Sequence, residues 1–205
     1  MNMKKKVISL ALMLVVATSI LMAASSWVGI NGTYELISMG KEFDAGNMKA
    51  DKAGNFMGLR LNNGFFADNG LGGIVDASLL FHLEDTKAVK WDSSYSIYVG
   101  PAYRLDLTDT LGVYGSLGFS MRKYSKTLAT VLQQDQKGSM THLGLGAQAA
   151  AQMKMSKNLL LTGGVQAGFH FSVTAQATGW LNSKPQKHDT NSFTVAPFIG
   201  IAYAP

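Results

Sequence analysis

Eight ionisable side chains interrupt stretches that otherwise consist largely of glycine, serine, threonine, alanine and glutamine. These residues are Glu35, Arg60, Asp76, His82, Arg104, Arg122, His142 and His170. An aspartate close to Arg60 or Arg104, and a glutamate that meets Arg122, would form buried ion pairs that fix packing. The same charges could instead line a gate or an anion-selective constriction of a narrow pore. Three imidazoles at one level could bind a metal ion, but lone interior histidines are usually just hydrogen-bonded, so we assign no metal site and no cofactor.

The placement of these side chains follows from an alternation with period two that recurs along the chain. Apolar residues alternate with small or polar ones in eight segments, which puts the two kinds on opposite faces of a β-strand. The segments are 27–36, 55–62, 71–83, 94–105, 111–122, 141–153, 159–173 and 192–203. We therefore predict an all-β fold, an eight-stranded antiparallel transmembrane β-barrel, with the ionisable residues on its inner face.

The distribution of charge decides which face of these strands meets lipid. Of the 205 residues, 47% are hydrophobic and only 15% are charged, against roughly 25% charged in soluble domains. The apolar faces of the eight segments contain no charged residue, histidine, asparagine or glutamine, whereas a barrel in water would carry charges outside. Because Lys or Arg at a bilayer midplane costs about 2–4 kcal/mol, this exclusion has a physical cause. The apolar face is expected to contact lipid and the polar face to line a lumen.

The beginning of the chain has the pattern of an export signal. Lys4, Lys5 and Lys6 precede an uncharged apolar run over residues 7–23, and small residues follow it, as in a secretory signal peptide. An uncleaved anchor is the alternative, since the run approaches the roughly 20 residues of a membrane span. We expect a signal peptide at residues 1–25 and a barrel domain at 26–205. Loss of three of the 18 basic residues leaves 15 against 13 acidic ones, so no basic patch for nucleic acid remains.

The connections between the segments alternate in length. They are short after the second, fourth and sixth segments and mostly longer after the others, for example at 123–139 and 174–191. Short turns face the periplasm and longer loops face outward in barrels inserted from the periplasm. Pro101 and Pro197 lie inside segments, where each removes a ladder hydrogen bond, so we expect a bulge at each. The second segment is expected to be short, with residues 63–70 as the longest periplasmic turn.

With a signal peptide, eight alternating strands and Tyr203 near its end, the chain resembles the OmpX/OmpW/OmpA-type superfamily of small outer-membrane β-barrel proteins. The resemblance implies a location in the cell outer membrane, reached through the periplasm. It implies outer-membrane lipids, periplasmic chaperones and the barrel-insertion machinery as partners. In the superfamily the last residue is commonly aromatic, whereas Ala204 and Pro205 follow Tyr203 here. The superfamily includes adhesion or structural proteins, small-solute channels and lipid-modifying enzymes, so the fold does not select a function.

This resemblance leaves three functions open. We expect a monomeric, non-enzymatic barrel without catalytic residues, whose extracellular loops bind a small ligand or a surface partner. A narrow porin-like channel for small or hydrophobic solutes is the alternative. The third function is a lipid A-modifying hydrolase, because His170–Phe171–Ser172 resembles the His-x-Ser of outer-membrane lipid A deacylases. Against it, the alternation turns His170 and Ser172 into the lumen, and no Asn follows the serine. The glycines of the inner face either relieve crowding of side chains in the lumen, which we favour, or leave a narrow water-filled path through it.

Overall fold

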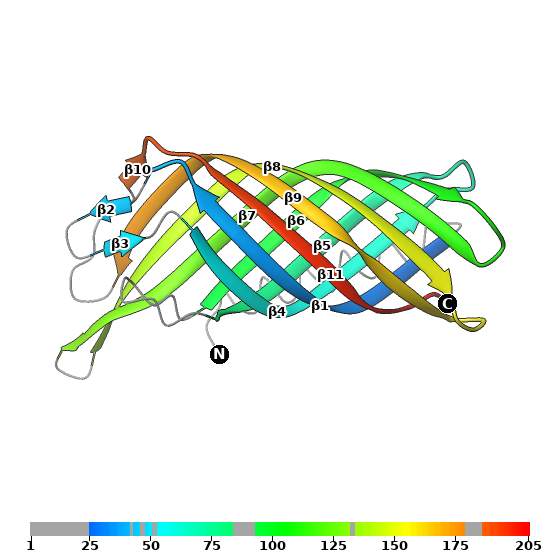
Figure 1. Cartoon of the computed structure of the whole chain (residues 1–205), viewed down its shortest axis with the longest axis horizontal. Coiled ribbons are helices and arrows are strands. Elements are labelled where there is room, and N and C mark those ends of the chain that lie inside the picture. The colour runs from blue at the N-terminus through cyan, green and yellow to red at the C-terminus, as the bar shows by residue number, and fades with distance from the viewer. Residues whose placement is uncertain are drawn as a thin grey trace.

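The chain folds into a closed antiparallel barrel. The computed structural model describes residues 25–41, 43–45, 48–50, 53–83, 93–131, 134–178 and 186–205. Residues 1–24 of the signal peptide predicted at 1–25 lie outside the described part of the chain. Within the described residues, eight long strands wrap obliquely around the long axis of the molecule (Figure 1). This arrangement confirms the predicted fold class. No helix among the described residues is long and apolar enough to cross a membrane.

Each long strand pairs with two neighbours, and the pairing of the first with the last closes the wall. In order around the barrel the strands are β1 (Ser25–Met39), β4 (Ala53–Phe66), β5 (Leu71–His82), β6 (Ser93–Asp106), β7 (Leu111–Val131), β8 (Gln134–Lys154), β9 (Leu159–Thr178) and β11 (Ser192–Tyr203). Three short strands, β2 (Phe43–Ala45), β3 (Met48–Ala50) and β10 (Gln186–His188), lie at one end of the barrel (Figure 1). We call this the outer end, because the short turns and the C-terminus lie at the other.

The predicted alternation between lipid and lumen is visible in the burial of β1. Trp27, Asn31 and Glu35 are almost completely buried, whereas Ile30 and Leu36, which alternate with them, are nearly half exposed. Large apolar side chains are exposed on the outside of the other barrel strands as well, up to 70% for Leu117. An exterior of this kind would be unfavourable in water, but it suits contact with hydrocarbon.

The lumen is filled by side chains in layers. At the outer end, an apolar cluster contains residues such as Met39, Phe56 and Leu80. At the periplasmic end, a second apolar cluster contains Trp27 and Phe66 among others. The buried charged residues of these strands lie between the two clusters, together with buried polar residues; they include Glu35, Arg60, Asp76, Arg122 and His142. The lumen is therefore a packed interior with a polar middle, as expected for a barrel of eight strands.

The second strand is longer than predicted. β4 continues through Asn63 and Gly64 to Phe66, so the periplasmic turn is short and lies between Phe66 and Leu71. The prediction of a long turn at 63–70 was wrong because residues 63–66 stay paired with residues 25–28 of β1. Gly64 instead faces the ring of Trp27, and a Cβ there would come within 2.5 Å of the indole. The turn itself depends on Gly70, whose φ of 79° favours glycine.

The prolines do not produce the expected bulges. Pro101 pairs with Gly73 and Pro197 pairs with Val165, and the register is the same on both sides of each proline. A proline removes one donor but adds no residue, so the pairing can continue past it. A bulge occurs instead in β9, where Leu143 pairs with Ser172 and the following Gly144 pairs with His170, which leaves Phe171 as the extra residue.

The region predicted as a loop at 123–139 is mostly strand. β7 and β8 pair from Leu111–Met153 as far as Val131–Gln134, with one register shift between Thr127 and Ala129, so only residues 132 and 133 separate them. In Figure 1 the outer ends of these two strands project beyond the barrel as a hairpin.

Candidate functional site

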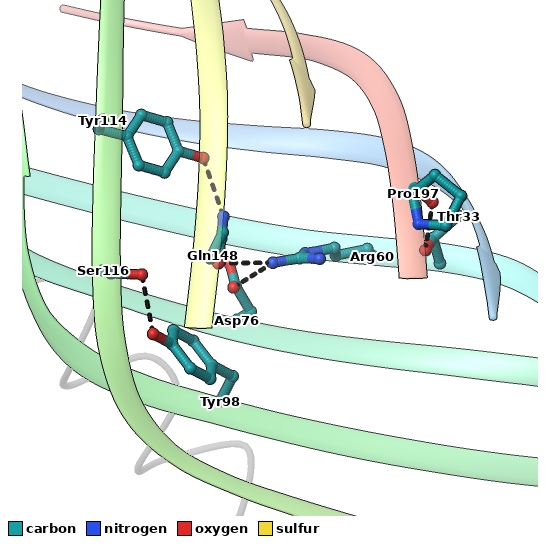
Figure 2. A network of polar contacts seen from close by, with 8 residues as sticks. All are labelled: Thr33, Arg60, Asp76, Tyr98, Tyr114, Ser116, Gln148 and Pro197. Carbon is teal, nitrogen blue, oxygen red and sulfur yellow. Dashed lines mark hydrogen bonds and ion pairs between the residues drawn. The ribbon is translucent and has the colours of Figure 1, made fainter. Parts of the chain in front are cut away.

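The first polar network crosses the middle of the lumen and is centred on Arg60. Its guanidinium Nη2 donates to Asp76 Oδ2 on β5 and, over 2.8 Å, to Gln148 Oε1 on β8. Gln148 Nε2 then donates to the Tyr114 hydroxyl at 3.0 Å (Figure 2). The Arg60 guanidinium also lies 4.1 Å from the centre of the Phe198 ring, a cation–π contact. β4 and β8 lie on opposite sides of the barrel, so the network spans its diameter.

A second ion pair closes the lumen nearer the outer end. Arg122 Nη1 on β7 contacts Glu35 Oε2 on β1, and both side chains are 1% exposed. The Tyr124 hydroxyl donates to the other carboxylate oxygen of Glu35 at 3.0 Å. β1 and β7 are also opposite strands, separated by three strands on either side. Each carboxylate thus meets a guanidinium in a place from which water is largely excluded, where an unpaired charge would be costly.

Two of the three histidines meet each other through a serine. Ser192 Oγ lies 2.7 Å from His142 Nδ1 and 3.3 Å from His170 Nδ1. His170 Nε2 lies 3.1 Å from Ser120 Oγ. The backbone of His82 ends β5, but its side chain lies outside the described part of the structure. No group of three potential metal-ligating side chains occurs among the described residues.

Arg104 lies apart from these networks. Its Nε donates to Asp106 Oδ1 at 2.8 Å at the periplasmic mouth, and Asp106 is two-thirds exposed. Two shallow hollows of about 440 and 340 Å³ flank this pair. Of the two arginines considered as partners for Asp76, only Arg60 is therefore in contact with it.

The β9 bulge changes the orientation predicted for the His-x-Ser segment. Before the bulge His170 is buried in the lumen, as its position in the alternation predicted. After the extra residue Phe171 the parity reverses: Val173, expected to face lipid, is fully buried, and Ser172, expected to face the lumen, is only half-buried on the outer face. His170 and Ser172 thus lie on opposite faces, and the histidine contacts Ser120 and Ser192 instead.

Sequence reasoning overlooked the neutral members of the networks. Gln148, Tyr114, Ser120 and Ser192 all lie on the inner faces of predicted strands, so their parity carried the signal. Tyr124 lies in the connection predicted at 123–139, for which the alternation gives no orientation.

The comparisons with known proteins agree with this geometry. Residues 8–196 match the outer membrane protein beta-barrel domain. The chain belongs to this family. Its members are barrels of the outer membrane, and the chain is located there. No curated protein matches the chain.

Solved outer-membrane barrels share this fold at low identity. Neisserial surface protein A is 15% identical, with a TM-score of 0.58 over 87% of this chain and 96% of that one. OprG of Pseudomonas aeruginosa is 12% identical, with a TM-score of 0.53 over 89% and 97%. Ail, the attachment invasion locus protein of Yersinia pestis, is 20% identical, with a TM-score of 0.50 over 90% and 100%. At these identities the likeness extends to the fold alone.

Proposed function

We propose that this outer-membrane barrel is a closed, monomeric and non-enzymatic scaffold that binds a surface partner through its projecting outer strands. The mature chain would follow a signal peptide at residues 1–25. Relatives with the same fold are named as a surface protein and an attachment protein, which supports a role at the cell surface. The observation that carries the proposal is the stretch of β7 beyond the barrel wall, which among the described residues pairs on one side only.

That edge is formed by the last residues of β7. β6 pairs with β7 only as far as Ser93 opposite Ser125, whereas the pairing of β7 with β8 continues to Val131, past a register shift between Thr127 and Ala129. Within the described residues, segment 126–131 therefore has a strand partner on one side only. At about 3.3 Å per residue it extends roughly 20 Å. Unpaired backbone donors and acceptors on such an edge can add an extended polypeptide as a further strand, and we propose a partner of that chemistry.

The packed lumen supports a scaffold over the alternative of a narrow channel. The Arg60 and Glu35–Arg122 contacts each join opposite strands, and apolar clusters lie on either side of them. An ion would have to displace both sets of polar contacts before it could pass through the lumen. Planar-bilayer recording of the refolded protein tests this point. We expect no stepwise openings, and openings that disappear on replacing Arg60 or Arg104 would establish the channel instead.

The surface-binding proposal is tested by removing the hairpin without cutting the barrel. Ser125 and Ser139 are paired, so residues 126–138 can be replaced by an Asn-Gly turn that joins them. The matched control replaces a second outer hairpin, formed by β2 and β3 within residues 43–50, by a flexible linker. Phage-displayed peptides would be selected on the wild-type protein in nanodiscs. We expect selected peptides to bind the control and not the shortened variant; equal binding to both variants, or no enrichment, would contradict the proposal.

A further inference from the structure

We propose that a groove on the outside of the barrel wall, centred on Gly32, holds one acyl chain of an outer-membrane lipid. We call this the Gly32 groove. It has a volume of about 730 Å³ and crosses β11, β1, β4 and β5. The inference depends on the outer-membrane location and on the shape of the wall, and not on the proposed binding at β7.

The groove exists because a side chain is missing from the middle of the lipid-facing surface. Gly32 pairs with Ile199 on β11 and with Leu59 on β4. Those two side chains are 65% and 59% exposed and form the two walls. A Cβ at Gly32 would meet only the Ile199 carbonyl oxygen, at 3.9 Å, so the space above the glycine is open. Met57 and Phe81, paired with each other, extend the groove toward the outer end.

The floor of the groove separates it from the lumen. Pro197 in β11 has no N–H to donate across to β1. The Thr33 hydroxyl donates to the Pro197 carbonyl oxygen at 3.0 Å and ties the two strands together there. Thr33 and Phe198, which also border the groove, are each only 5% exposed. The groove is therefore a surface site and not a side exit from the interior.

The chemistry of the lining selects a hydrocarbon occupant. None of the residues lining the Gly32 groove is charged, and its walls are aliphatic and aromatic side chains. This part of the wall faces the hydrocarbon of the membrane, so the molecules available to it are lipids. An unfilled gap would leave the lining without dispersion contacts, whereas a methylene chain laid between Ile199 and Leu59 restores them. Tyr34 borders the groove on its outer side, and an aromatic hydroxyl suits the boundary between chains and headgroups.

A second glycine provides a matched control. Gly115 on β7 also faces lipid, and a Cβ there would meet only the Gln148 carbonyl oxygen at 3.8 Å. It does not line the Gly32 groove. Phenylalanine at either position is thus accommodated outside the wall, but only Gly32→Phe fills the groove.

Native mass spectrometry of the purified protein in detergent with palmitoyl-oleoyl-phosphatidylethanolamine tests the proposal. We expect the wild type and Gly115→Phe to retain one lipid. Gly32→Phe should raise the lipid concentration needed for half-retention by about tenfold, the factor in the dissociation constant that follows from losing the burial of only two methylene groups. Equal retention by Gly32→Phe, or equal loss in Gly115→Phe, would overturn the site.

Two additions keep the result interpretable. Gly32→Leu fills the same space with a smaller side chain, and heat-modifiable gel mobility shows whether each variant is folded. A dimer that Gly32→Phe abolishes would assign the groove to a second copy of the chain and would also overturn the lipid proposal.

Discussion

The buried Arg60–Asp76 pair should contribute far more to stability than the Arg104–Asp106 pair, although the residue types are the same. The first pair is 1% and 3% exposed and the second is 21% and 66% exposed. Arg60→Met leaves the Asp76 carboxylate buried without its partner, which costs about 3–5 kcal/mol. Arg104→Met removes a largely solvated pair worth about 0–1 kcal/mol.

Urea unfolding in lipid vesicles measures this difference, with tryptophan fluorescence, to which the buried Trp27 contributes, as a probe. At a slope of about 2 kcal/mol per molar urea, Arg60→Met should lower the midpoint by about 2 M and Arg104→Met by less than about 0.5 M. The single variants Arg60→Met and Asp76→Asn and their double variant form a thermodynamic cycle. The double variant should be more stable than the sum of the single effects by more than about 1 kcal/mol.

Two results would refute this reasoning. Equal midpoint shifts for Arg60→Met and Arg104→Met would mean that the lumen is hydrated enough to screen the pair. Additive single effects would mean that Arg60 acts through Gln148 and Phe198 rather than through Asp76.

Three further predictions concern single positions. Gly64→Val should destabilise the barrel by about 1–3 kcal/mol and shift Trp27 emission, because the new side chain meets the indole; Gly115→Val, which has room, should change neither, and an unchanged Gly64 variant would show that Trp27 can move aside. Gly70→Ala should cost at least about 1–2 kcal/mol in urea unfolding because of the positive φ, with Gly70→Asn intermediate; no difference between alanine and glycine would show that the turn takes another conformation. Ser172→Ala should leave the lipid A acylation pattern of cells producing the protein the same as the wild-type pattern, since His170 faces away from it; a changed pattern would reveal a hydrolase.

The sequence allowed the barrel, the number of strands and most inward-facing residues to be predicted, because period-two alternation depends on local chemistry alone. The exclusion of charge from one face of each segment likewise identified the lipid side. What could not be predicted depends on contacts between distant strands. Residues 63–66 continue the second strand because they pair with β1, where Gly64 lies against the Trp27 ring. The bulge at Phe171 follows from the register of β8 against β9, which no property of the single strand determines.

The contacts of the candidate site likewise include some that could be predicted from the sequence and some that could not. That Asp76 would meet an arginine was evident from strand order, but the choice of Arg60 over Arg104 depends on depth within the barrel. The contact of Gln148 with Arg60 crosses the full width of the lumen and leaves no trace in local spacing.

The opposition of β1 and β7 across the lumen has a consequence for how the barrel is assembled. Glu35 belongs to the first strand, and its guanidinium partner belongs to the fifth of the eight long strands. A sheet of the first four strands inserted alone would expose this carboxylate to hydrocarbon or to a half-formed, wet interior. The charge is neutralised only when the sheet curls far enough for Arg122 to reach across. Closure and charge neutralisation are thus one event, which favours cooperative insertion of a finished barrel over strand-by-strand entry into the membrane.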